Sequence, residues 1–185
     1  MEHITVLLNE SVDALNIKED GIYVDATLGG GGHSELILSK LKNGHLYAFD
    51  QDTYALNRAS QRLSKYNNKT LIHSNFSNMK NELNKLGITK VDGIIMDLGL
   101  SSFQIDDETR GFSYLKDYEL DMRMDRTNPL SAKVVINTYT REQLADIFRK
   151  YGEEDNAWRI AGEIVNNRPL ETTFDIVKIT DRVNY

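Results

Sequence analysis

Apolar positions follow two alternating periods through the first hundred residues. Short runs rich in β-branched and aromatic residues are separated by longer segments whose apolar residues recur at helical spacing. The predicted strands cover 22–26, 45–49, 70–76 and 91–97, and the predicted helices cover 34–42, 54–66 and 79–86. This alternation indicates an α/β fold, in which a parallel sheet carries helices on both faces.

The pattern changes after Phe103. Residues 103–130 are typical of a loop rich in Asp, Arg, Gly and aromatic residues, and Thr140 to Gln143 form a capping-box pattern that opens a helix. Apolar stripes then predict three helices and are expected to be core: Leu144, Ile147, Phe148 and Tyr151; Trp158, Ala161, Ile164 and Val165; Ile176, Val177 and Ile179. We therefore predict a Rossmann-like domain over 1–105 and a small helical domain over 106–185.

Four glycines, Gly29 to Gly32, separate the first predicted strand from the first predicted helix. Glycine lets the backbone turn sharply and approach a ligand, and free N–H groups at a helix N-terminus favour electronegative ligand atoms. The second strand ends in Asp50, nineteen residues after Gly31, where an acid usually binds ribose hydroxyls. The sequence therefore predicts a nucleotide pocket at the carboxyl ends of the strands, where Asp25, Phe76 and Asp97 also fall.

The spacing of the glycines separates two classes of nucleotide cofactor. A dinucleotide site needs a third glycine, but Ser34 stands three residues after Gly31. The pattern Asp25-x-x-x-Gly29-x-Gly31 instead resembles motif I of S-adenosylmethionine-dependent methyltransferases, in which the acid of the first strand can receive the ammonium group of the cofactor. A nicotinamide-dependent oxidoreductase is the disfavoured alternative.

The composition of the 185 residues, 40% apolar and 27% charged, is that of an ordinary globular protein. No apolar stretch approaches the ~18 residues of a membrane span, and the first ten residues lack the basic region of a signal peptide. Cysteine is absent, and His3, His33, His45 and His73 show no metal-ligand spacing. We expect a cytoplasmic protein with no membrane partner and no metal site.

The charge is uneven along the chain. A net charge of −6 argues against binding nucleic acid by bulk charge. However, residues 110–185 hold 12 Lys and Arg against 13 Asp and Glu, whereas residues 1–109 hold 10 against 15. Eight of the ten arginines lie after residue 109, and arginine suits phosphate and stacked-base contacts. Any RNA contact is therefore expected in the second part.

Three stretches together carry a specific family resemblance: Asp25-Ala-Thr-Leu-Gly-Gly-Gly-Gly-His-Ser34, Asp97-Leu-Gly-Leu-Ser-Ser-Phe-Gln-Ile-Asp106 and Arg110-Gly-Phe-Ser-Tyr…Leu120-Asp-Met-Arg-Met-Asp125. They resemble the bacterial ribosomal RNA small-subunit methyltransferase H family, which methylates the exocyclic N4 of a decoding-centre cytidine in 16S rRNA. The resemblance implies an enzyme with a class I methyltransferase sheet and a helical insertion domain. It also implies S-adenosyl-L-methionine as cofactor and 16S rRNA of the small ribosomal subunit as partner.

The resemblance implies cofactor contacts from seven residues: Gly31, Gly32, His33, Asp50, Phe76, Asp97 and Gln104. Phe76 would form an aromatic wall for adenine. Asp97 is the catalytic candidate, because a carboxylate that accepts a hydrogen bond from cytosine N4 raises its electron density and can later take the proton. Phe103, Phe112 and Tyr114 are candidates for stacking on the exposed base.

The chain departs from the family pattern in two respects. Thr5 stands where the family has proline, and this difference is expected to be minor. Family members are also longer, so we expect an incomplete sheet of order three-two-one-four, and a non-catalytic S-adenosylmethionine- or RNA-binding fragment is the alternative function. The strand at 91–96 would then be an open edge through which the chain forms a homodimer.

Overall fold

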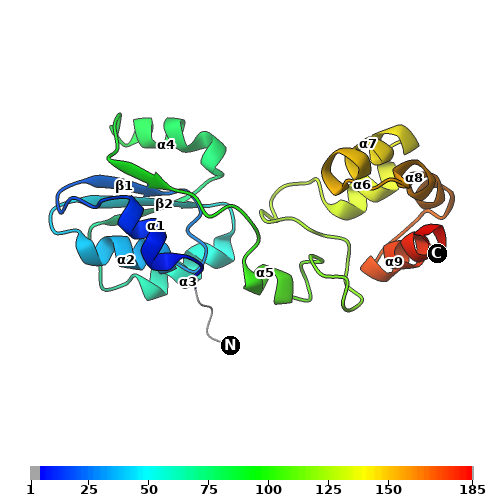
Figure 1. The fold of residues 1–185 in the computed structure, drawn as a ribbon, viewed down its shortest axis with the longest axis horizontal. Coiled ribbons are helices and arrows are strands. Elements are labelled where there is room, and N and C mark those ends of the chain that lie inside the picture. Colours follow the sequence, from blue (N-terminus) through cyan, green and yellow to red (C-terminus); the bar gives the residue numbers. More distant parts are fainter. Residues whose placement is uncertain (1–4, 185) are drawn as a thin grey trace. The chain divides into compact units, whose positions relative to one another are not determined.

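The computed structural model of the chain describes residues 5–184 (Figure 1). His3 and the start of the segment assessed for a signal peptide lie outside these residues. The described chain divides into two compact units, with the boundary between Ser101 and Ser102. Each unit has its own core, so each is described by itself.

A four-stranded parallel sheet forms the centre of the first unit. Its strands are β1 (Ile22–Asp25), β2 (His45–Asp50), β3 (Lys69–His73) and β4 (Gly93–Ile95). They lie in the order β3-β2-β1-β4, which confirms the predicted Rossmann-like α/β fold and its strand order. Asp25 pairs with Ala48 on one side and Ile95 on the other, so β1 is an inner strand that is in register with both β2 and β4.

Helices cover both faces of this sheet, as predicted. On one face lie α1 (Leu8–Ala14), α2 (Gly32–Lys40) and α3 (Thr53–Arg62), and on the other lies α4 (Met79–Lys85) (Figure 1). The α1 helix was not predicted. The predicted elements at 54–66, 70–76 and 91–97 are shorter in the structure. The β4 strand ends at Ile95 because its partner β1 ends opposite, at Asp25.

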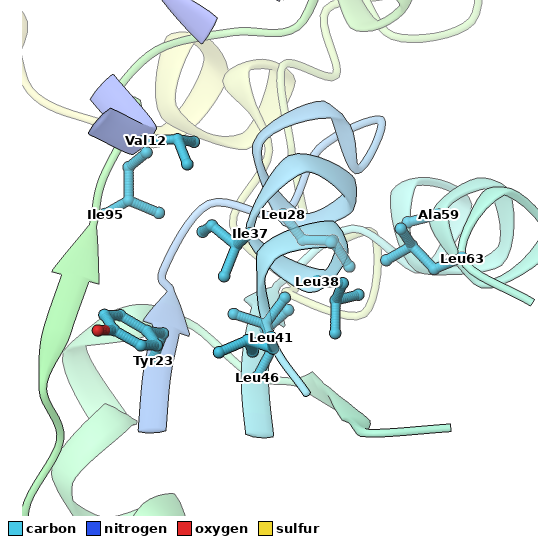
Figure 2. Close-up of a cluster of buried hydrophobic side chains, with 11 residues drawn as sticks. Val12, Tyr23, Leu28, Ile37, Leu38, Leu41, Leu46, Ala59, Leu63 and Ile95 are labelled. Atoms are coloured by element: carbon cyan, nitrogen blue, oxygen red, sulfur yellow. The ribbon is translucent and has the colours of Figure 1, made fainter. Parts of the chain in front are cut away.

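Alternating side chains of the strands pack in two layers. Tyr23 and Leu46 point towards the cluster formed with α1, α2 and α3, which is drawn in Figure 2. Val24 and Phe49, on the same two strands, point to the opposite face and pack against Leu83 of α4. This alternation is the period of two expected of buried strands, and it divides the core of the unit between the two faces of the sheet.

The second unit is helical. It contains α5 (Ser102–Asp106), α6 (Ala132–Thr138), α7 (Arg141–Gly152), α8 (Ala157–Asn166) and α9 (Thr173–Asn184). The Thr140 and Gln143 side chains form the predicted capping box at the start of α7. Its buried core draws on α6, α7, α8 and α9 and includes Leu144, Ile160, Ile164 and Ile179.

Two expectations for the helical unit were wrong. Residues 103–130 were expected to be loop throughout, but they begin within α5, and α6 follows at Ala132 without having been predicted. Tyr151 and Trp158 were placed on core stripes, but both are exposed. Tyr151 lies in the last turn of α7. Trp158 lies in the first turn of α8, at the edge of the buried stripe that Ala157, Ile160 and Ile164 form.

Candidate cofactor site

The loop between β1 and α2 depends on glycine for its conformation. Gly29 has a φ of +50° and Gly31 a φ of +79°, a region that L side chains rarely adopt. Gly31 is also the N-cap of α2, so the loop turns directly into the helix. The sequence therefore builds a tight glycine turn that leads directly into a helix N-terminus, which is an arrangement suited to electronegative ligand atoms.

Asp50, the last residue of β2, joins this loop to the sheet. One carboxylate oxygen accepts the Gly29 N–H at 2.8 Å, and the other accepts the Asp52 N–H at 2.8 Å. Burial raises the pKa of the Asp50 carboxyl above its ordinary value, and the backbone hydrogen bonds oppose this shift. Each oxygen has a second lone pair, so the carboxylate can also accept hydrogen bonds from ribose hydroxyls.

Asp25, the last residue of β1, is buried beneath the glycine loop and accepts hydrogen bonds from residues on either side of the glycines. It is 1% exposed, and its oxygens accept the Ser34 hydroxyl at 2.7 Å and the Thr27 N–H at 3.1 Å. Burial raises the pKa of the Asp25 carboxyl, while the hydrogen bonds of Ser34 and Thr27 and the nearby His33 act in the opposite direction. Because the protein encloses this carboxylate, the structure favours a role in holding the loop over the expected role of receiving a ligand ammonium.

His33, in the first turn of α2, carries a buried polar atom that needs a partner. Its side chain is 7% exposed, and its Nε2 atom has no hydrogen-bond partner among residues 5–184. An unpaired buried nitrogen is costly, and most such atoms are satisfied by protein, water or ligand. This atom fits a site whose occupant supplies the missing hydrogen bond beside the glycine loop.

Phe76 and Asp97 follow the two outer strands. Phe76 opens the short helix η1 (Phe76–Asn78) three residues after β3, and it is 38% exposed, so its ring is accessible to a ligand. Asp97 lies two residues after β4 and is exposed, and its N–H donates to the Thr27 hydroxyl oxygen at 2.7 Å. The strand-end placement predicted from the sequence is therefore confirmed on all four strands.

Gln104 is placed differently from the other six predicted residues. It lies in α5 of the second unit and is buried, whereas the others belong to the first unit. The structure therefore groups Gly31, Gly32, His33, Asp50, Phe76 and Asp97 in one unit, at the glycine loop and the ends of the strands. A cofactor role for Gln104 stays a prediction.

Three supporting residues were not predicted to have a role at this site. Thr27 and Ser34 bind Asp25, and both lie inside the glycine-loop motif that carried the resemblance. Thr5 lies against Gly32, since a Cβ built on that glycine would stand 1.9 Å from the Thr5 hydroxyl oxygen. The departure at Thr5 was visible in the sequence, but its contact with a residue 27 positions later was not.

The second unit contains a loop stabilised by paired charges. The buried Asp121 carboxylate forms ion pairs with Arg123 and Arg126, and the Met122 N–H donates to the Arg110 carbonyl at 2.8 Å. These residues come from the third motif of the resemblance, which therefore has a structural role. In the same loop Tyr114 is 73% exposed.

Within residues 5–184, no helix has the length and apolar character needed to cross a membrane. The same residues contain no cluster of three or more His, Asp or Glu side chains arranged to hold a metal ion.

Comparison with known proteins identifies the family. The chain is 68% identical over 184 residues to ribosomal RNA small subunit methyltransferase H 1 of Acholeplasma laidlawii, an alignment that covers 100% of this chain and 62% of that protein. It is 54% identical to ribosomal RNA small subunit methyltransferase H of Exiguobacterium sibiricum, covering 96% of this chain and 58% of that protein. The chain thus spans about 60% of the length of the curated relatives it matches. A family model described as the MraW methylase family matches residues 1–184, and the chain belongs to this family.

Proposed function

We propose that this chain belongs to an S-adenosylmethionine-dependent methyltransferase that modifies the exocyclic N4 of a cytidine in the decoding region of 16S rRNA. Two relatives are named as methyltransferases of small-subunit ribosomal RNA, which supports the reaction class and the substrate. The observation that carries the proposal is the grouping of a glycine loop, Asp50 and Asp97 with a buried His33 nitrogen that has no partner among residues 5–184. A ribosomal substrate would place the protein in the cytoplasm.

The proposed cofactor site assigns one task to each group. Gly31 and Gly32 allow close approach of the backbone, Asp50 accepts the ribose hydroxyls, and Phe76 packs against adenine. The ligand would form a hydrogen bond with the His33 Nε2 atom. S-adenosylmethionine supplies an electrophilic methyl group when it is bound, and the protein then acts mainly by positioning donor and acceptor.

Asp97 is the proposed catalytic residue. The cytosine N4 is a weak nucleophile because its lone pair is delocalised into the ring. A carboxylate that accepts a hydrogen bond from N4 raises its electron density, and it can receive the proton that N4 loses after methyl transfer. Asp97 is exposed at the end of β4, so its carboxylate is accessible to a substrate base.

The target base must leave its RNA stack before it reaches a protein site. Of the three aromatic residues considered for stacking, Phe103 and Phe112 are partly buried, whereas Tyr114 is exposed on its loop. We therefore propose that Tyr114 stacks on a base of the bound RNA. The arginine-rich composition of residues 110–185 supports an RNA contact in the same unit.

A paired assay separates catalysis from binding alone. S-adenosylhomocysteine is titrated into the chain by calorimetry, and in parallel the chain is incubated with S-adenosylmethionine and small ribosomal subunits, followed by mass spectrometry of the cytidines. Binding together with N4-methylcytidine supports the proposed enzyme. Binding without methylation supports a non-catalytic cofactor-binding fragment, and the absence of binding contradicts both this fragment and the proposed enzyme.

We also propose that two copies of the chain associate through β4. Within the described part of the sheet β4 pairs only with β1, and Ile94 and Met96 on and beside it are exposed. An open edge with apolar side chains recruits another strand. Light scattering at rising concentration should show a dimer that Met96→Lys disrupts, whereas a monomer at every concentration would exclude the association.

A further inference from the structure

We infer that Thr27 is the positioning residue that sets the place of Asp97. The Asp97 N–H donates to the Thr27 hydroxyl oxygen at 2.7 Å, although the two residues are 70 positions apart. The inference rests on the proposed function, because it gives Asp97 its role at the methyl-transfer site. Thr27 itself acts through Asp97, with no direct part in the chemistry.

Backbone pairing between β1 and β4 ends just before Asp97. The Ala26 N–H donates to the Ile95 carbonyl at 2.9 Å, which continues the ladder by one residue beyond Asp25. Beyond this bond, residues 96–100 have no regular secondary structure, and Asp97 is exposed. The Thr27 side chain therefore provides the next cross-link after the ladder and holds the first part of the loop against β1.

Thr27 can hold Asp97 because it is itself held on the core. Its N–H donates to the buried Asp25 carboxylate at 3.1 Å, and that carboxylate also accepts the Ser34 hydroxyl at 2.7 Å. The next residue, Leu28, donates its N–H to the Phe49 carbonyl at 2.9 Å. Hydrogen bonds to β1, β2 and α2 thus fix the position of Thr27. The hydrogen bond between the Thr27 hydroxyl and the Asp97 N–H then restrains Asp97 relative to these elements.

A small displacement of Asp97 would matter for its proposed role. Catalysis by positioning requires donor, acceptor and carboxylate to be held within a fraction of an ångström. Valine has nearly the shape of threonine but no hydroxyl, so Thr27→Val removes the cross-link and leaves the packing. Thr27→Ser keeps the hydroxyl, and Thr89→Val makes the same change at an exposed threonine as a control.

The test measures the affinity of the whole chain for S-adenosylhomocysteine and the hydrogen exchange of the Asp97 amide by NMR. Thr27→Val should weaken binding about three- to tenfold, the effect of one hydrogen bond, and should speed exchange at Asp97. Thr27→Ser and Thr89→Val should stay within about twofold of the wild type in affinity. In an Asp97→Ala background, Thr27→Val should cause little further loss, because the group that it positions is gone.

Two results would overturn the inference: unchanged exchange at Asp97 in Thr27→Val, or an equal loss of affinity with and without the Asp97 carboxylate. The second result would show that Thr27 acts only on the loop as a whole. If the wild type does not bind S-adenosylhomocysteine, the proposed function fails, but the exchange at Asp97 still decides whether Thr27 restrains it.

Discussion

The Gly29 N–H and the Asp50 carboxylate lie 2.8 Å apart in a hydrogen bond that joins the glycine loop to the end of β2. Asp50 is therefore part of the loop's structure as well as a candidate ligand for ribose. Asp25 is also part of the loop's structure, because its carboxylate accepts hydrogen bonds from Thr27 and Ser34. Variants at the site must accordingly be tested for stability and for binding.

Replacing Asp50 should weaken cofactor binding. Asp50→Ala should reduce the affinity for S-adenosylmethionine by ~1–3 kcal/mol, the usual loss when a charged hydrogen-bond partner is removed. Calorimetric titration measures the affinity, and thermal unfolding shows whether the loop still folds. Asp20 is exposed, so Asp20→Ala is the matched control and should bind S-adenosylmethionine with the affinity of the wild type. An unchanged affinity in Asp50→Ala would remove Asp50 from the pocket.

The buried Asp25 predicts a specific dependence of stability on pH. Burial raises its pKa above the ordinary value of 3.8, so the folded protein binds this proton more tightly than the unfolded chain. The contribution of Asp25 to stability is therefore greatest below pH 3.8, and it falls as the pH rises through the raised pKa. The Asp25→Asn variant carries an amide at this position, which does not titrate.

The measurement is urea unfolding of the wild type and of Asp25→Asn at a series of pH values. The free energy of unfolding of the wild type minus that of the variant should decrease as the pH rises from 3.8 through the raised pKa of Asp25. At higher pH the difference should level off. Asp20→Asn provides the baseline for replacing an exposed carboxyl. A difference that stays flat or rises with pH would contradict the assignment of Asp25 as a desolvated acid.

Gly32 should resist substitution because of Thr5. A Cβ on Gly32 would lie 1.9 Å from the Thr5 hydroxyl oxygen and 3.0 Å from the Thr5 Cβ, so Gly32→Ala must displace the N-terminal segment. We expect a loss of about 1–3 kcal/mol in the free energy of unfolding, as for other overpacked sites. Thr5→Gly should recover much of this loss in the double variant.

Gly152→Ala is the control for this experiment, because a Cβ at that position meets nothing within 4 Å. It should be nearly neutral in urea unfolding. If Gly32→Ala costs the same with and without Thr5→Gly, the contact between the two residues does not explain the need for glycine.

Tyr114 should contribute to RNA binding by stacking. Tyr114→Ala should weaken binding of a single-stranded RNA that contains the target cytidine by ~1–3 kcal/mol, the usual contribution of one base–aromatic stack. Tyr151→Ala is a matched control, because Tyr151 is 74% exposed and Tyr114 is 73% exposed. Fluorescence anisotropy measures both. Equal losses in the two variants would assign them to general surface contact, and no loss in Tyr114→Ala would exclude the stack.

The sequence predicts the strand ends well because the signal there is local. A short apolar run followed by an acid specifies both the strand and the residue at its end, as at Asp25 and Asp50. The link between Thr27 and Asp97 could not be predicted in this way, since it depends on how β1 and β4 align across 70 residues. Hydrogen bonds of this kind follow from sheet register, which a single sequence does not display.

The exposed aromatic residues of the helical unit show a second limit. Helical spacing correctly predicted α7 and α8 but also assigned Trp158 to their core. In the structure Arg141 stacks on the Trp158 ring, with its guanidinium carbon 4.2 Å from the ring centroid, and donates to the Trp158 carbonyl. An arginine can thus cover an aromatic face that spacing alone places among apolar residues.

The central claim is that S-adenosylmethionine binds at the glycine loop and the carboxyl ends of the strands. NMR spectra of the isotopically labelled chain, recorded during titration with S-adenosylhomocysteine, test this claim most directly. We predict saturable shifts of the amides of Gly29, Gly31, His33, Asp50 and Asp97, no such shifts in the core of α7 and α8, and no response to NADH. Unchanged spectra at saturating S-adenosylhomocysteine, or shifts confined to residues away from this loop, would contradict the account.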